Sequence, residues 1–418
     1  MRTPLGHFAA FATLLCVIGS LLLSCHKPIE LLWKEDMAAA SVSTPLVGDN
    51  FMAVGTDRGL SIFALNGDLR CSFDARGEII SYPATDGQRL YFGSTNYLVY
   101  ALDLSCNEVW KYATQDRIKS DPAVVGDKVF IGSYDGHVYA LSTVTGNLVW
   151  AFPKLPIKTT ELSVSPLPTV ETVTPSKGKR KEADPSKVKG EAKSKAPPHD
   201  IIPAKSPVDS PTLVVGSFSY SSPQVVDGVV YLGNLDGHIY ALSEKDGALL
   251  WRFKTEGAVT SSPRIENGTL YIGSNDGGIY ALRLPDQNQT TPTLLWRYAT
   301  QGFVNSSARW VDGTIYIGSY DRHIYAIDAS TGNLVWKFPT KGPVISIPAV
   351  YQNLVIVAGG SGDGAIYVLD RTHGKLFWKY DTKGKIESDP VIVDNRFYIS
   401  STDQNLYAFI IHQTKEDP

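Results

Sequence analysis

The chain offers little sulfur chemistry and little net charge. Of its four cysteines, Cys16 and Cys25 lie within or directly after an N-terminal apolar run, which leaves Cys71 and Cys106 for the folded part. The formal net charge of the 418 residues is −3, so there is no global field of the kind that nucleic-acid-binding proteins carry. We therefore expect no nucleic-acid partner.

Motifs that carry catalysis are also missing. The sequence has no glycine-rich phosphate loop, no nucleophile elbow and no Cys or His pair at metal-ligand spacing. Asp-Gly pairs stand where hairpins require them, at 135–136, 236–237, 276–277 and 363–364. Three histidines share one repeat position, namely His137, His238 and His323. We expect turns and structural hydrogen bonds at these positions, and no catalytic residue, cofactor or metal.

One segment lacks the apolar content of a folded domain. Residues 175–205 hold nine Lys or Arg, four Asp or Glu and five Pro, with no aromatic residue. Such a segment cannot bury enough apolar surface to offset its ordering entropy, so the insertion at 153–216 is expected to be a disordered basic loop. It is either an inert linker or a tether for an anionic partner such as lipid headgroups or cell-wall polymer.

Tryptophan marks a repeat of about forty residues. Seven of the eight tryptophans occupy one repeat position: Trp33, Trp110, Trp150, Trp251, Trp296, Trp336 and Trp378. A Pro or Ala that opens the next repeat follows 12 residues later in every case but Trp150, where 61 extra residues intervene; in one repeat Cys71 replaces the Trp. A period of this size, built of short alternating strands, indicates a ring or stack of β units.

Each repeat predicts four strands, which we name a to d. In the third repeat they are expected at 122–125, 129–132, 138–141 and 148–152, separated by turn residues. A glycine stands four residues before the Trp position in most repeats, where only glycine accepts a positive φ without cost. Each Trp on strand d is expected to cover the face between blades and bury about 200 Å². The alternative role is stacking on a cofactor.

The eighth repeat, 388–409, ends after strand c. The missing strand d is found at 31–34, in the same 12-residue register to Pro45 as every other strand d. Pairing of the two chain ends would leave no unpaired edge between blades. The sequence therefore predicts an all-β fold at 30–409, an eight-bladed β-propeller with four-stranded blades whose ring is closed by an N-terminal strand.

The two remaining cysteines fall where the repeat is irregular. Cys71 stands at the Trp position of blade 1, and Cys106 stands at the turn-glycine position of blade 2. An oxidising periplasm would permit a disulfide between these adjacent blades, but the sequence supplies no distance. A disulfide and two unpaired, partly buried thiols both remain open.

The N-terminus resembles a bacterial lipoprotein signal. Arg2 precedes an apolar run at 8–23 that ends in Ser24-Cys25, so residues 1–24 are expected to be the signal peptide and Cys25 the acylated residue. Two or more acyl chains suffice for stable anchoring. Residues 25–29 would then be the tether, and 410–418 the C-terminal tail. An ordinary signal peptide and an uncleaved anchor are the alternatives.

The blade-4 repeat, YLGNLDGHIYAL at 231–242 followed by Gly247 and Trp251, resembles the pyrroloquinoline-quinone-type propeller repeat. The resemblance covers 30–409 apart from the insertion. This repeat occurs in quinoprotein alcohol dehydrogenases and in the BamB-type lipoproteins of outer-membrane assembly. The dehydrogenases carry adjacent cysteines and calcium-binding carboxylates. The chain has no adjacent cysteine pair. Its lipoprotein-type signal ending in Ser24-Cys25 and its length are similar to those of the BamB-type proteins.

That resemblance implies a membrane-anchored, non-catalytic scaffold for protein–protein interaction in outer-membrane β-barrel assembly. It implies the barrel insertase as partner, a monomer within a complex, and a lipid anchor on the periplasmic face of the outer membrane, which His26 after the acylated cysteine favours. The contact surface is expected on the d-to-a loops and b-to-c turns, with candidate residues Arg117, Lys119, Arg322, Lys383 and Lys385. The alternatives are a quinoprotein-like dehydrogenase and a lipoprotein that binds cell-wall polymer through its basic loop.

Overall fold

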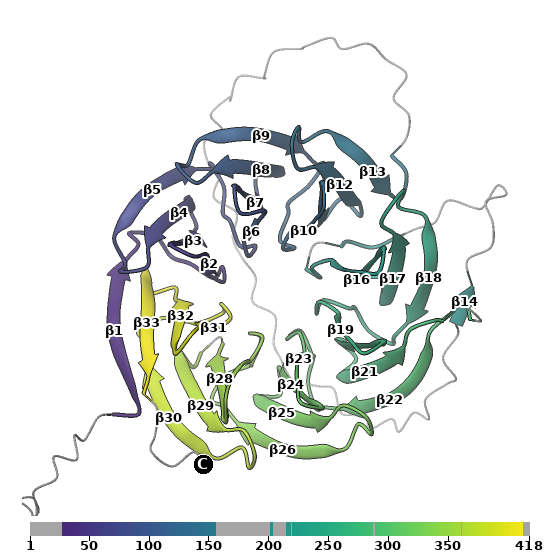
Figure 1. The fold of residues 1–418 in the computed structure, drawn as a ribbon. Helices are drawn as coiled ribbons and strands as arrows, with labels where there is room; N and C mark the ends of the chain where they lie inside the picture. The colour runs from purple at the N-terminus through teal and green to yellow at the C-terminus, as the bar shows by residue number, and fades with distance from the viewer. Residues whose placement is uncertain are drawn as a thin grey trace, which may run out of the picture.

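A computed structural model describes residues 27–155, 201–203, 215–218, 220–286, 289–360 and 362–412. Within these ranges the regular elements are β-strands, arranged as eight sheets around a central axis (Figure 1). This confirms the predicted eight-bladed propeller. No helix long and apolar enough to cross a membrane is found in the described part of the chain. The expected signal peptide and the expected acylation site, Cys25, lie outside the described residues.

The first four blades follow one another around the ring. Blade 1 is β2 (Leu46–Val47), β3 (Phe51–Gly55), β4 (Gly59–Ala64) and β5 (Leu69–Asp74). Blade 2 is β6 (Ala84–Thr85), β7 (Arg89–Gly93), β8 (Leu98–Asp103) and β9 (Glu108–Ala113). Blade 3 is β10 (Ala123–Val125), β11 (Lys128–Gly132), β12 (Val138–Ser142) and β13 (Leu148–Phe152). Blade 4 is β15 (Gln224–Val226), β16 (Val229–Gly233), β17 (His238–Ser243) and β18 (Leu249–Lys254).

The remaining blades repeat the pattern. Blade 5 is β19 (Arg264–Glu266), β20 (Thr269–Gly273), β21 (Gly278–Arg283) and β22 (Thr293–Ala299). Blade 6 is β23 (Arg309–Val311), β24 (Thr314–Ser319), β25 (His323–Asp328) and β26 (Leu334–Pro339). Blade 7 is β27 (Ala349–Tyr351), β28 (Leu354–Gly359), β29 (Ala365–Asp370) and β30 (Leu376–Asp381). Blade 8 is β31 (Val391–Val393), β32 (Arg396–Ser400), β33 (Asn405–Ile411) and the N-terminal β1 (Ile29–Asp36).

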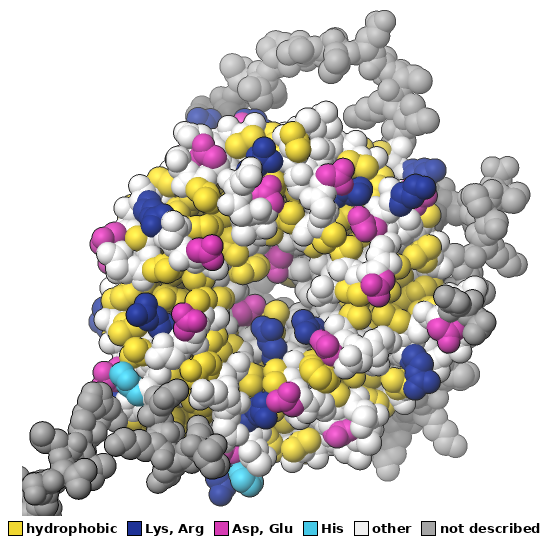
Figure 2. All heavy atoms as spheres, in the orientation of Figure 1, with side chains coloured by type: hydrophobic (Ala, Val, Ile, Leu, Met, Phe, Trp, Pro, Cys, Tyr) yellow, Lys and Arg dark blue, Asp and Glu magenta, His cyan; other side chains and the backbone are white. Residues whose placement is uncertain are grey.

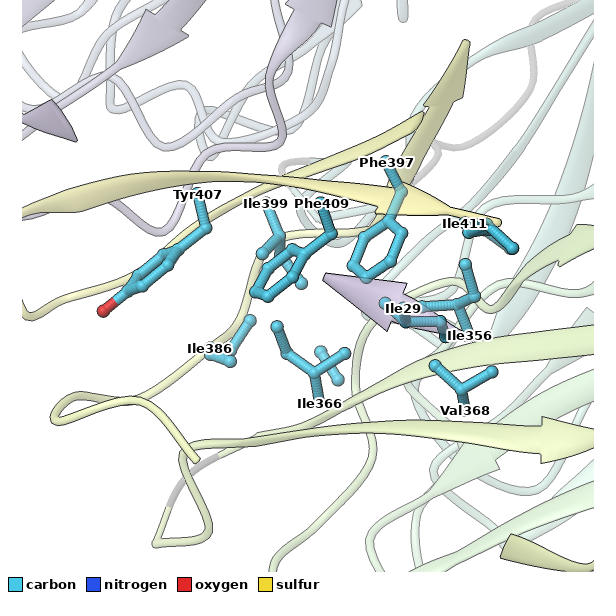
Figure 3. Packing of buried hydrophobic residues seen from close by; sticks show 12 residues of the cluster. Ile29, Ile356, Ile366, Val368, Ile386, Phe397, Ile399, Tyr407, Phe409 and Ile411 are labelled. Atoms are coloured by element: carbon cyan, nitrogen blue, oxygen red, sulfur yellow. The ribbon is translucent and has the colours of Figure 1, made fainter. Parts of the chain in front are cut away.

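The two chain ends close the ring, as the sequence predicts. β1 pairs antiparallel with β33, from Ile29 opposite Ile411 to Asp36 opposite Asn405. Ile29 is fully buried in a cluster that also contains Phe397 and Phe409, whose rings stack (Figure 3). Blade 8 is therefore completed both by backbone pairing and by apolar packing.

Most seams between blades are covered by an indole. The indole N–H of Trp336, on β26, donates to the backbone oxygen of Arg371 in blade 7 at 2.8 Å. A Cβ at Gly374 would lie 2.6 Å from that indole, so this turn needs glycine both for its positive φ of 67° and for the approach of the ring. Equivalent indole hydrogen bonds are made by Trp110, Trp150 and Trp296.

The seam between blades 1 and 2 is held covalently. Cys71 on β5 and Cys106 in the following blade form a disulfide with a Cα–Cα distance of 6.1 Å. Cys106 has a φ of 66° at the position where other blades carry glycine. Of the two arrangements that the sequence leaves open, the structure has the bonded one, at the place where other seams have an indole against a glycine.

The insertion meets blade 4. Residues 201–203 form a short strand, β14 (Ile201–Pro203), that pairs with the outer strand β18 as a fifth strand. Residues 156–200 and 204–214, on which the prediction of a disordered loop mainly rests, lie outside the described residues.

Candidate interaction surface at the channel mouth

An aspartate in the b-to-c turn ties neighbouring blades together. Asp135 accepts hydrogen bonds from the Tyr139 hydroxyl at 2.8 Å and from the backbone N–H of Gln115, in the preceding d-to-a loop, at 2.8 Å. The same pair of bonds is made by Asp276, Asp321, Asp363 and Asp403. Each of these b-to-c turns is therefore hydrogen-bonded to the d-to-a loop beside it.

Hydrogen bonds favour the ionised form of Asp135. Burial opposes the charge on Asp135, but hydrogen bonds from His137, Gln115 and Tyr139 outweigh it and lower the pKa of the carboxyl. Burial and the same hydrogen bond raise the pKa of Tyr139. The Nδ1 atom of His137 lies 3.2 Å from Asp135, and His238 has the equivalent contact with Asp236 at 3.1 Å. In the part of the chain that the structure describes, no group of three or more His, Cys, Asp or Glu is arranged to hold a metal ion.

Two of the five candidate contact residues share aromatic partners. The Arg117 guanidinium lies 5.3 Å from the centre of the Tyr134 ring, and the Lys119 ammonium lies 5.7 Å from Tyr134 and 5.1 Å from Tyr220. The two tyrosine rings meet edge to face at 5.5 Å. Tyr220 is 44% exposed. We call Arg117, Lys119, Tyr134 and Tyr220 the cation–aromatic cluster.

Blade 6 has an aromatic pair of its own, in which Phe303 and Tyr320 hold the positions of Arg117 and Tyr134. Phe303 and Tyr320 lie 6.1 Å apart, and the Tyr320 N–H donates to the Phe303 oxygen at 2.8 Å. Arg322 follows Tyr320 in the same turn and is exposed. The sequence Gly-Ser-Tyr-Asp, at 132–135 and 318–321, marks the turn tyrosines Tyr134 and Tyr320 but not Tyr220 or Phe303.

Lys383 and Lys385 belong to the d-to-a loop between blades 7 and 8. Their backbone N–H groups donate to Asp403 at 3.1 Å and to the Thr402 hydroxyl at 2.8 Å, and both residues are exposed. Four of the five predicted residues thus lie in d-to-a loops, and Arg322 lies in a b-to-c turn of the same face. Arg117 and Lys119 are brought together on the Tyr134 ring, and Lys383 and Lys385 share a loop. The sequence analysis missed four aromatic residues on this face: Tyr134, Tyr220, Phe303 and Tyr320.

Inside the ring, the residue before the opening Pro or Ala of a blade links most blades to the next one. Its backbone N–H donates to the side chain at the equivalent position of the following blade. Six such bonds are found among the described residues: Tyr82 to Asp121, Asp121 to Ser222, Ser222 to Ser262, Ser262 to Ser307, Ile347 to Asp389, and Asp389 to Thr44. The series is interrupted at Ile347 and at Tyr82, because neither side chain has a hydrogen-bond acceptor close to its backbone.

Side chains of both charge signs lie around the central opening of the ring (Figure 2). Asp121, Asp389, Arg309 and Trp310 line a cavity of about 480 Å³. Burial, together with the neighbouring Asp121, raises the pKa of Asp389 to about 7, although the hydrogen bond from the Ile347 N–H and the charge of Arg309 oppose the rise. Burial also raises the pKa of Asp121.

Replacement of Asp389 by asparagine is expected to flatten the pH dependence of stability. The folded-state pKa of about 7 exceeds the unfolded value of about 3.9, so the folded protein holds the proton more tightly. The free energy of unfolding therefore falls as pH rises from about 4 to about 7, and levels off above that. The asparagine side chain would keep an acceptor for the Ile347 N–H and avoid the buried charge. We expect a gain of about 1–3 kcal/mol at pH 8, measured by urea denaturation.

The control is the exposed Asp49→Asn, which should leave the slope between pH 4 and pH 7 unchanged. An unchanged slope in the Asp389→Asn variant would contradict the assignment of that slope to Asp389.

Comparison with known proteins adds a family and a shared fold. A family model described as outer membrane protein assembly factor BamB matches residues 30–186, 213–309, 286–362 and 352–416. No curated protein sequence matches the chain. The crystal structure of BamB from Moraxella catarrhalis is similar with a TM-score of 0.66 and 15% identity, over 91% of this chain and 99% of that one.

The crystal structure of the computationally designed Ika8 protein is similar with a TM-score of 0.64 and 16% identity, over 89% of this chain and 96% of that one. At such identities the two structures establish a common fold and nothing further.

Proposed function

Because the chain belongs to the family of the outer membrane protein assembly factor BamB, we propose that it is a membrane-anchored, non-catalytic scaffold in outer-membrane β-barrel assembly. The observation that carries this proposal is the family match over most of the chain. The proposed partner is the β-barrel insertase, and the proposed anchor is acylated Cys25 on the periplasmic face of the outer membrane. The protein would be a monomer within that complex.

The loop face supports a docking role. Its d-to-a loops and b-to-c turns are tied to each other through turn aspartates such as Asp135 and Asp276. A surface held in place before binding loses less conformational entropy when a partner docks. The cation–aromatic cluster supplies tyrosine and arginine, the residue types that dominate binding energy at protein interfaces. We propose that this cluster contacts the insertase.

Charge reversal in the cluster is expected to release the partner. Arg117→Glu combined with Lys119→Glu would remove the cations stacked on Tyr134 and Tyr220 and place carboxylates there instead. We expect recovery of barrel-assembly components from detergent-solubilised envelope to fall about tenfold, which corresponds to about 1.4 kcal/mol. The measurement is quantitative mass spectrometry of material captured on the tagged protein.

The matched control is Lys245→Glu, an exposed charge reversal in a c-to-d turn of blade 4, which should leave capture unchanged. Equal capture by both variants would exclude the cluster from the interface. Capture of peptidoglycan fragments would favour the cell-wall alternative, and dye-linked dehydrogenase activity with pyrroloquinoline quinone and calcium would favour the enzyme.

A further inference from the structure

The start of every outer strand exposes apolar side chains. The pairing of each outer strand shifts register directly before the Trp position, as between Leu31 and Trp33 in β1. Such a bulge breaks the alternation of the strand, so consecutive side chains reach the surface. The exposed apolar residues at these positions are Leu31, Leu32, Leu69, Val109, Leu148, Val149, Leu250, Leu295, Leu334, Val335, Leu376 and Phe377.

One part of this belt surrounds the point where the chain enters the ring. Pro28, the residue before β1, shares a small surface pocket with Phe377 of blade 7. On the other side, Trp33 packs against Gly67 of blade 1, two residues before Leu69. We call Leu376, Phe377, Leu31, Leu32 and Leu69 the tether arc. It runs over blades 7, 8 and 1.

The tether is too short to hold this arc far from a membrane. Ile29 follows Cys25 by four residues, and a fully extended chain spans about 3.5 Å per residue, or about 14 Å in all. The headgroup layer of one leaflet is about 5–8 Å thick. An acyl chain on Cys25 starts at that layer, so the edge of the ring lies within about a side-chain length of the lipid.

We propose that the tether arc is a membrane-contacting surface whose partner is the phospholipid bilayer. The proposal rests on the proposed acylation of Cys25. Apolar side chains at this depth insert into the boundary between headgroups and acyl chains, and an indole such as that of Trp33 is favoured at the same level. The arc lies on the outer wall of the ring, so the disc stands with this edge against the bilayer. The loop face that carries the cation–aromatic cluster then stays open to a protein partner.

The test places a photo-crosslinking benzoylphenylalanine at residue 32 or 377 of the full chain, purified with its anchor and reconstituted into phosphatidylethanolamine–phosphatidylglycerol vesicles. The matched controls carry it at residues 149 and 295, which hold the same repeat position in blades 3 and 5. Wild-type exposure is alike: 42% for Leu32 and Phe377, 48% for Val149 and 38% for Leu295. We expect lipid adducts to be about tenfold more abundant at 32 and 377, because only residues at the headgroup–acyl boundary meet lipid.

Equal adduct yields at all four positions, or no adducts at 32 and 377, would overturn the proposal. The intact mass of the same preparations reports whether Cys25 carries acyl chains. Modified Cys25 without lipid adducts overturns membrane contact alone, whereas unmodified Cys25 overturns membrane contact together with the lipid anchor. Capture of barrel-assembly components is scored separately and reports on the scaffold function.

Discussion

Deletion of β1, residues 29–36, is expected to turn a monomeric propeller into an aggregating protein. Blade 8 would keep three strands and expose the edge of β33 along the stretch that β1 covers from Ile411 to Asn405. An unpaired, flat apolar edge is a template for pairing with other chains. Loss of Ile29 from its buried cluster alone costs about 2–5 kcal/mol. Light scattering after size exclusion, together with thermal unfolding, would measure both effects.

The control is deletion of residues 180–187, eight residues within the insertion. This variant should stay monomeric and keep the melting temperature of the full chain. A β1-deleted chain that stays monomeric with an unchanged transition would show that the pairing with β33 does not stabilise the ring.

Trp336→Ala is expected to destabilise the protein by about 3–5 kcal/mol, as measured by urea denaturation. The substitution empties the space beside Gly374 and leaves the Arg371 oxygen without its indole donor. The partly buried carbonyl then loses a hydrogen bond, in addition to the cost of the cavity. The loss falls on the seam between blades 6 and 7.

Trp310→Ala is the matched comparison, because Trp310 lies outside the repeat position and is only partly buried in its cluster. We expect a clearly smaller loss of stability there. Equal losses would mean that the indoles matter for their size and not for their place at a seam.

The fold could be predicted because one short sequence spacing recurs along the chain. The 12 residues from a repeat Trp to the next opening Pro or Ala, a count that only Trp150 breaks, identify the last strand of one blade and the start of the next, and the same count from Trp33 to Pro45 identifies the closing strand. Contacts that depend on the insertion could not be predicted in this way. Tyr134 and Tyr220 meet at 5.5 Å, although the insertion lies between them in the sequence.

The disulfide shows that a repeat pattern gives the positions of two residues in their blades but not the distance between them. The sequence places Cys71 at the Trp position and Cys106 at the glycine position, and the structure shows that these two positions face each other across a seam. The hydrogen bonds inside the channel were missed for a related reason. The residue before the opening proline differs from blade to blade, as in Asp121, Ser222 and Ile347, so no motif marks a shared role.

Ring closure by β1 also determines how the molecule would respond to mechanical load. If the membrane holds the chain just before Ile29 while a partner holds the loop face, tension enters the protein along β1. The hydrogen bonds between β1 and β33 lie across the strand direction, so a pull along β1 loads them together instead of one after another. The strand next to the tether could slip free only if the whole ladder gave way at once. The β1–β33 ladder would therefore resist being pulled apart under load. Blade 8 is the part of the ring that bears the force.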